Sequence, residues 1–246
     1  GDFDSHPHLT SLTINADADL TGWIDFANDA DGNDVTTSLT INGAGDVKID
    51  GIWEDDNVNI VYTGSGSLEL GVDLNSNDQD AWEPLNGSFN ASTATGDVAV
   101  RLDLNESDDV QFSFVGSKGD NTVYINESTA YYGVLDGNGN VDDNASISIA
   151  AGPGHNDTLV IYNDDDVAEH VADIYSGFET LRVEQFGEDG DGNQYYDLSH
   201  VGTDFTSLEL VYRDDNQWDW NGNVDVVVNS ALAKDISLID AGEDAY

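Results

Sequence analysis

A short alternating unit, Ser/Thr-Leu-x-Ile/Leu/Val, recurs along this chain and constrains its fold more than any other feature. Polar and apolar residues alternate in each copy, which is the period-two pattern of a β-strand that buries one face. Leu12 and Ile14 are therefore expected to point inward, and Thr13 outward. The copies start at Ser11, Ser38 and Ser67, then at Thr158, Thr180, Ser207 and Ser237, with looser versions at 98–102, 122–125 and 146–149.

The spacing of these copies indicates how the strands are arranged. Successive starts lie 27 and 29 residues apart in the first set, and 22, 27 and 30 apart in the second. Turns rich in Gly, Asn and Asp separate them, usually with another short apolar run. Two or three short strands in a unit of this length make one coil of a β-solenoid, in which each coil covers the apolar face of the next. The sequence predicts an all-β, irregular β-solenoid resembling the stack of a parallel β-helix, with an antiparallel β-sandwich as the alternative.

One segment departs from the strand pattern. Three aspartates at 164–166 precede apolar residues spaced i, i+4 and i+7, and Gly177 stands where a helix C-terminus favours glycine. Acids in a first helical turn also interact well with the helix dipole. We expect one short helix near 165–175, which would separate two lobes or close one end of the stack. The chain is expected to form one elongated unit over 1–246, divisible into lobes at 1–150 and 151–246.

Charge is the second strong constraint, because 50 acidic residues face only six basic ones and the formal net charge is -44. Such a chain repels itself when compact unless cations offset the charge. Only 11 of the acids are Glu, and Asp is the acid that tight turns and metal chelation favour. Calcium loops and a salt-adapted surface are both compatible with this composition. The scattered basic residues exclude nucleic acid and insertion into anionic membranes as expected functions.

The chain contains neither Cys nor Met. Disulfides and thiol chemistry are excluded, and the absence of Met leads us to expect a processed or excised part of a longer protein. No apolar run approaches the roughly 20 residues of a membrane span. A thiol-free, acidic chain that depends on calcium fits the cell exterior, where calcium is millimolar.

Four acidic loops of the form Asp-x-Asp/Asn-Gly-Asn carry the metal-binding prediction. Side-chain oxygens at alternate positions, with a glycine that lets the backbone curl, suit a hard cation that takes six to eight oxygens. In the strongest loop, the ligands would stand at positions 1, 3, 5 and 9 of an EF-hand-like register without its flanking helices; they are Asp189, Asp191, Asn193 and Asp197.

The other three loops are weaker, because Asp-Gly and Asn-Gly are also common turn dipeptides. Each adds a carboxylate just downstream, so that several Ca²⁺ ions are expected in all. Their candidate ligands are Asp29, Asp31, Asn33 and Asp34; Asp136, Asn138, Asn140 and Asp142; and Asp219, Asn221, Asn223 and Asp225.

Two further turns, at 152–159 (Gly-Pro-Gly-His-Asn-Asp-Thr-Leu) and 116–123 (Gly-Ser-Lys-Gly-Asp-Asn-Thr-Val), resemble the Gly-Gly-x-Gly-x-Asp-x-Leu repeat of RTX calcium-binding proteins. The resemblance implies calcium held between successive coils, with Asp157 and Asp120 as candidate ligands. The match is incomplete, since Asn121 stands where the repeat has aspartate and neither turn has a tandem copy nine residues on.

The region from about 150 to 212 is similar to stretches of RTX-type bacterial surface-layer proteins, through Asp157-Thr158-Leu159, Gly177-Phe178-Glu179-Thr180-Leu181 and Asp197-Leu198-Ser199. This similarity implies an extracellular, calcium-dependent structural protein that assembles with itself into a layer or filament. A calcium-dependent adhesin or carbohydrate-binding module, with cell-surface polysaccharide as partner, is the alternative, since five tryptophans could stack on sugars. An enzyme is not expected, because His155, His170, His200, Arg182 and Arg213 share no spacing that would align them.

Overall fold

The computed structural model describes eleven segments of the chain. All structural statements below concern these segments, which are residues 11–25, 37–53, 58–72, 86–102, 111–125, 146–162, 174–186, 194–198, 205–212, 224–228 and 235–240.

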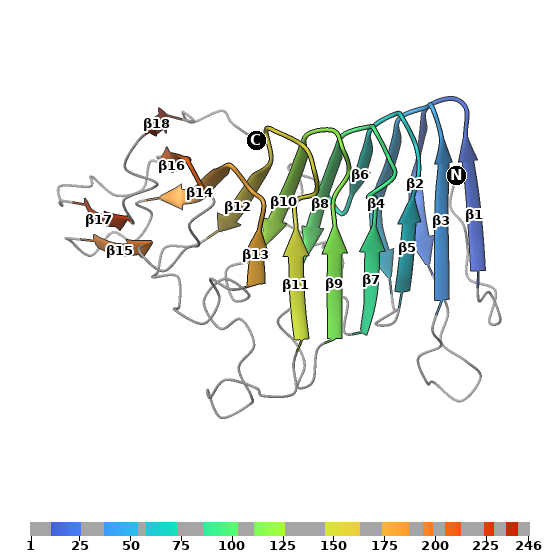
Figure 1. Ribbon diagram of the computed structural model, residues 1–246, viewed down its shortest axis with the longest axis horizontal. Helices are drawn as coiled ribbons and strands as arrows, with labels where there is room; N and C mark the ends of the chain where they lie inside the picture. The colour runs from blue at the N-terminus through green and yellow to red at the C-terminus, as the bar shows by residue number, and fades with distance from the viewer. Residues whose placement is uncertain are drawn as a thin grey trace.

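Parallel strands of three to seven residues, and one of two, build the described part of the fold. Odd-numbered strands up to β13 form a seven-stranded sheet in the order β1-β3-β5-β7-β9-β11-β13, and even-numbered strands form a nine-stranded sheet from β18 to β2 (Figure 1). The first sheet contains β1 Ser11–Ala16, β3 Thr37–Gly43, β5 Val58–Tyr62, β7 Asn86–Asn90, β9 Gln111–Val115, β11 Ser146–Ala150 and β13 Tyr175–Ser176.

The second sheet runs without a break across residue 150. It contains β2 Leu20–Asp25, β4 Val47–Trp53, β6 Leu68–Leu70, β8 Val98–Leu102, β10 Asn121–Ile125, β12 Thr158–Tyr162, β14 Thr180–Phe186, β16 Ser207–Tyr212 and β18 Ile236–Asp240. A separate pair is formed by β15 Gln194–Leu198 and β17 Val224–Val228. The division into two lobes stays a prediction.

From β1 to β14 each coil of the solenoid contributes one strand to each of the two large sheets, so the predicted β-solenoid is confirmed. Every described strand pairing is parallel, which excludes the antiparallel sandwich. No helix occurs in the described segments. The helix expected near 165–175 falls mainly on 163–173, outside the described residues, and its last residue, Tyr175, begins β13.

The repeat needs two corrections. Ser11 and Ser38 are register partners in the seven-stranded sheet, but Ser67 precedes β6 in the other sheet. The last copy starts two residues earlier than expected, because Ile236, not Leu238, pairs with Leu208. Thr158, Thr180 and Ser207 do occupy one register position, as their shared motif indicates.

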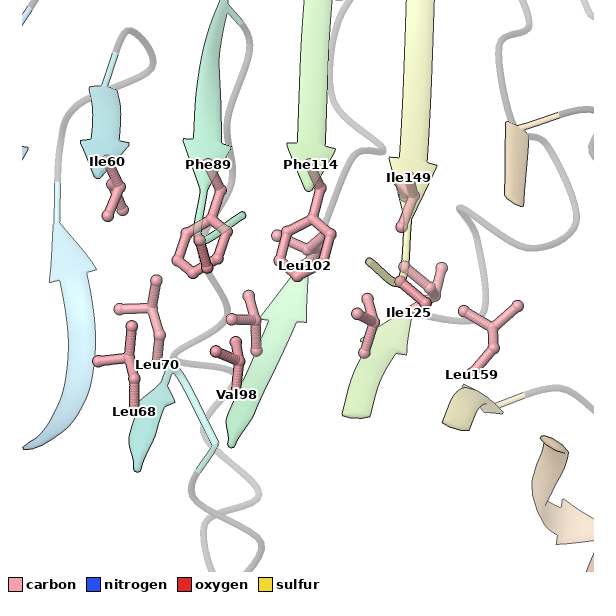
Figure 2. Packing of buried hydrophobic residues seen from close by; sticks show 14 of the residues in the cluster. Ile60, Leu68, Leu70, Phe89, Val98, Leu102, Phe114, Ile125, Ile149 and Leu159 are labelled. Carbon is pink, nitrogen blue, oxygen red and sulfur yellow. The ribbon is translucent and has the colours of Figure 1, made fainter. Parts of the chain in front are cut away.

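The core lies between the two sheets and is filled by the alternate residues of both. Leu39, Ile41, Leu68 and Leu70 are fully buried, and Ile14 and Thr13 lie on opposite faces of β1 as expected. Figure 2 shows large side chains of the seven-stranded sheet, such as Ile60, Phe89, Phe114 and Ile149, facing aliphatic residues of the nine-stranded sheet. The register places Phe89 beside Phe114, and their rings stack at 4.7 Å, an arrangement that contributes roughly 1 kcal/mol beyond burial.

Candidate metal centre

Short turns connect each odd-numbered strand to the next even-numbered strand, and together they form what we call the turn edge. These turns are residues 17–19, 44–46, 63–67, 91–97, 116–120, 151–157 and 177–179. Strand register aligns the residue before each of β2, β4, β6, β8 and β10 with Asn156, two residues before β12, in one column. The first six members of this column are Asp19, Asp46, Ser67, Asp97, Asp120 and Asn156.

Three of these acids bind the backbone of the following coil. Asp19 Oδ1 accepts a hydrogen bond from the Asp46 N–H at 3.2 Å, and Asp46 Oδ1 accepts one from the Ser67 N–H at 2.7 Å. Asp97 Oδ1 accepts one from the Asp120 N–H at 2.9 Å. The backbone and side-chain hydrogen bonds from Ser67 lower the pKa of Asp46, because they favour its charged form. These carboxylates therefore extend the hydrogen-bonding of the sheet by one bond per coil.

Sequence reasoning missed Asp19, Asp46 and Asp97, although a local signal was present. Gly-Asp or Gly-Ser precedes four even-numbered strands, at 45–46, 66–67, 96–97 and 119–120. The glycines are needed because the turns stack too closely for a Cβ, which at Gly96 would lie 1.5 Å from the carbonyl oxygen of Gly66. A recurring Gly-Asp/Ser dipeptide before an apolar strand therefore marks this edge.

A buried polar network links the two RTX-like turns. Ser117, Asn121 and Asp157 are each fully buried. Asn121 Oδ1 accepts a hydrogen bond from the Ser117 N–H at 2.8 Å. Its Nδ2 donates to the carbonyls of Ser117 at 3.3 Å and Gly119 at 2.9 Å, and to Asp157 Oδ1 at 2.7 Å. The amide of Asn121 thus gathers three oxygens from two coils.

Asp157 is the residue of this network that has a side-chain oxygen without a hydrogen-bond partner. Its Oδ1 accepts hydrogen bonds from both the backbone N–H and the Nδ2 of Asn121, each at 2.7 Å. Its Oδ2 is buried and has no hydrogen-bond partner. Burial raises the pKa of Asp157; the hydrogen bonds from Asn121 oppose this, while the charges of Glu179 and Asp120 add to it. Either a proton or a cation would relieve the unpaired oxygen.

The donor chemistry around Asp157 suits a hard cation, since only oxygen atoms are offered. Asp120 stands on one neighbouring coil, where it accepts hydrogen bonds from Asn156 Nδ2 at 3.3 and 3.5 Å. Glu179 stands on the other, and its Oε2 accepts a hydrogen bond from the Asp157 N–H at 2.8 Å. No group of three or more His, Asp or Glu residues in the described segments already surrounds a common point. An ion held by Asp157 would need backbone carbonyls and water to complete six to eight oxygens.

The four acidic loops predicted from sequence lie almost entirely outside the described residues. This applies to Asp29, Asp31, Asn33 and Asp34; Asp136, Asn138, Asn140 and Asp142; Asp189, Asp191 and Asn193; and Asp219, Asn221 and Asn223. Asp197 and Asp225 belong to β15 and β17, which pair in parallel from Gln194 and Val224 onward. Two of the loops therefore lead into neighbouring strands. Of all eighteen predicted ligands, only Asp120 and Asp157 can be placed in a described site.

Comparison of the chain with protein-family models, curated proteins and solved structures yields no match. Among the described residues there is also no helix with the length and hydrophobicity of a membrane span.

Proposed function

We propose that this protein is an extracellular, calcium-binding structural protein that assembles with copies of itself into a surface layer or filament. The buried and unpartnered Oδ2 of Asp157, with Asp120 and Glu179 on the adjoining coils, is the observation that supports calcium most directly. A divalent ion there would replace a costly buried charge with a neutralised one.

The net charge of -44 supports the same proposal at the level of the whole chain. Calcium bound between coils would reduce the repulsion among the acids and would contribute its binding free energy to folding. Calcium shared by carboxylates of two copies would also allow such acidic molecules to approach one another. Both effects need the millimolar calcium of the cell exterior, since extracellular modules bind this ion with dissociation constants of about 10⁻⁴ to 10⁻³ M.

Chelation provides the test of calcium binding. Far-ultraviolet circular dichroism at moderate salt should show loss of β-structure, or a much lower melting temperature, when EDTA replaces millimolar calcium. Magnesium at equal concentration is the matched control for ionic strength; it should restore less, because it requires a smaller, octahedral site. Identical melting curves in EDTA and in calcium would contradict calcium binding.

Electron microscopy provides the test of assembly. Ordered sheets or filaments should form when calcium is added to the purified protein, and magnesium should not replace it. Isolated monomers that bind glycans on an array but never polymerise with calcium would instead favour the adhesin.

A further inference from the structure

The seven-stranded sheet carries no charged residue. Its strands together comprise 35 residues, and none is Asp, Glu, Lys or Arg. At the chain-wide frequency of 23 % charged, about eight of these 35 positions would carry a charge. We call the outward-facing side chains of β1, β3, β5, β7, β9 and β11 the uncharged face.

The rest of the described surface is different. Strands of the nine-stranded sheet contain both acids and bases, and outward residues of this sheet form ion pairs. Lys48 Nζ lies 3.7 Å from Asp50 Oδ1 and 3.8 Å from Glu69 Oε2. Arg182 Nη2 lies 2.6 Å from Glu209 Oε2. The turn edge carries the acidic column that begins with Asp19. Among the described residues, the seven-stranded sheet thus differs in charge from the nine-stranded sheet and from the turn edge.

The uncharged face is also regular. Strand register aligns its side chains in straight columns, one of which is Ser11, Ser38, Asn59, Ser88, Ser113 and Ser148. Hydrogen bonds run along these columns, from Asn42 Nδ2 to Asn15 Oδ1 at 3.1 Å and from Ser88 Oγ to Asn59 Oδ1 at 2.8 Å. Val61 lies in the adjacent column and is 42 % exposed. Short side chains in straight columns make a flat surface that another flat surface can approach closely.

The chemistry of this face identifies the partner it fits. Its outward residues are Ser, Thr, Asn, Gln, Val and Ala, without an aromatic ring for stacking on sugars. Two chains of net charge -44 repel wherever acids meet, and at physiological salt this repulsion acts over roughly 8 Å. Contact through the uncharged face keeps the acids of both copies out of the interface.

We propose that the uncharged face packs against the same face of a second copy, as an isologous contact related by a two-fold axis. This inference rests on the self-assembly proposed above and names one surface that takes part in it, since an isologous contact closes as a dimer and a layer or filament needs a second contact to extend. Six strands about 4.8 Å apart and five residues of about 3.3 Å each cover roughly 400 Å² per copy. That is about half of the roughly 800 Å² per partner in a stable complex. One such contact is therefore weak by itself, and it contributes to assembly together with the other contacts of a polymer.

Three variants test the proposal in millimolar calcium, by sedimentation velocity and light scattering across protein concentration. Ser113→Asp places one charge on the uncharged face. Ser113→Asn is the neutral control at the same position, and Ala99→Asp adds the same charge to the outer face of the nine-stranded sheet. We expect Ser113→Asp to raise the concentration at which the protein assembles at least tenfold, and the two controls to change it less than twofold.

Chemical crosslinking gives a second measurement that does not depend on an added charge. The chain has no Cys, so Val61→Cys and Ala99→Cys each place one thiol, on the uncharged face and on the opposite face. A short bismaleimide should link Val61→Cys into dimers in calcium and leave Ala99→Cys monomeric.

The outcomes separate this inference from the proposed function. If the wild-type protein assembles but Ser113→Asp and Ala99→Asp behave alike, and only Ala99→Cys crosslinks, assembly stands and the uncharged face is not its surface. If the wild-type protein stays monomeric in calcium at all concentrations, both proposals are overturned. Retention of monomers by microcrystalline cellulose would then favour a polysaccharide over a second copy as the partner of this protein.

Discussion

The two RTX-like turns lie on adjacent coils, yet the side chains at their shared register position form different sets of hydrogen bonds. Directly after the turn at 116–120, the register position is occupied by Asn121, whose amide donates to three oxygens and accepts from one N–H. In the turn at 151–157 the partner in that position is Asp157, whose second oxygen has no hydrogen-bond partner. An amide nitrogen carries protons and can collect oxygens, which an ionised carboxylate cannot do.

This difference bears on the proposed binding of calcium, because the two turns differ in how many of their polar atoms have partners. Asn121 places an uncharged donor where a cation would otherwise collect the oxygens of Ser117, Gly119 and Asp157. The amide of Asn121 has partners for both its oxygen and its nitrogen, whereas Asp157 keeps one buried oxygen without a partner that a proton or a cation would satisfy. If calcium binds as proposed, we therefore expect it at the turn with the acid and not at the turn with the amide.

The largest expected effect comes from making the two turns alike with Asn121→Asp. The change removes three donated hydrogen bonds and places a second buried carboxylate against Asp157. We expect the free energy of unfolding in EDTA to fall by about 4 kcal/mol, the scale on which an uncompensated buried charge destabilises a protein. Urea titration followed by circular dichroism measures it, and calcium should recover most of the loss.

Asn121→Ala is the matched control for this substitution. It removes the same donors without adding a charge, so it should be destabilised to a similar extent in EDTA and in calcium. An Asn121→Asp variant that gains no more from calcium than Asn121→Ala would show that the amide does not stand in for a cation.

A smaller effect is expected from Asp157→Asn, which gives the second turn an amide like the first. The folded-state pKa of Asp157 is raised above its ordinary value of 3.8. Its contribution to stability is therefore fully present below that value and is lost as pH rises through the folded-state pKa. In EDTA at pH 7 the variant should be more stable than the wild type, on the order of 1 kcal/mol, the penalty for an unpaired buried polar atom.

Urea titrations between pH 4 and 7 measure this difference. It should shrink toward pH 4, where the wild-type carboxyl gains a proton, and saturating calcium should reverse its sign at pH 7. A wild type that remains more stable than Asp157→Asn in EDTA at pH 7 would contradict a destabilising effect of the unpartnered Oδ2.

The strand faces could be predicted because period-two alternation is a local property, as Leu39 and Ile41 show by being fully buried. The sheet to which each strand belongs could not. Ser38 and Ser67 begin the same motif in different sheets, since both sheets bury one face against the same core. The motif at Ser237 lies within the last strand but does not give its register, because Ile236 pairs with Leu208 and a shift of two leaves every side chain on the same face.

The candidate site shows the same limit. Asp157 could be identified from its turn motif, but its state depends on Asn121, which lies 36 residues away in the sequence. The column from Asp19 to Asp120 likewise depends on which turns stack, and this follows from strand register and not from local sequence. Residue types could be predicted, and their partners could not.

The smallest effect is expected from Asp46→Ala, at an exposed position of the same turn edge. Hydrogen bonds from Ser67 lower the pKa of Asp46, so its contribution to stability is present above 3.8 and is lost as pH falls through the folded-state pKa. This sign is opposite to that of Asp157. Calorimetric melting from pH 2 to 7 should show Asp46→Ala slightly less stable than the wild type at neutral pH and equal to it in acid. Because Asp46 Oδ1 accepts the Ser67 N–H, we expect the same difference in EDTA and in calcium. A difference that appears only in calcium would extend the proposed metal centre along the acidic column.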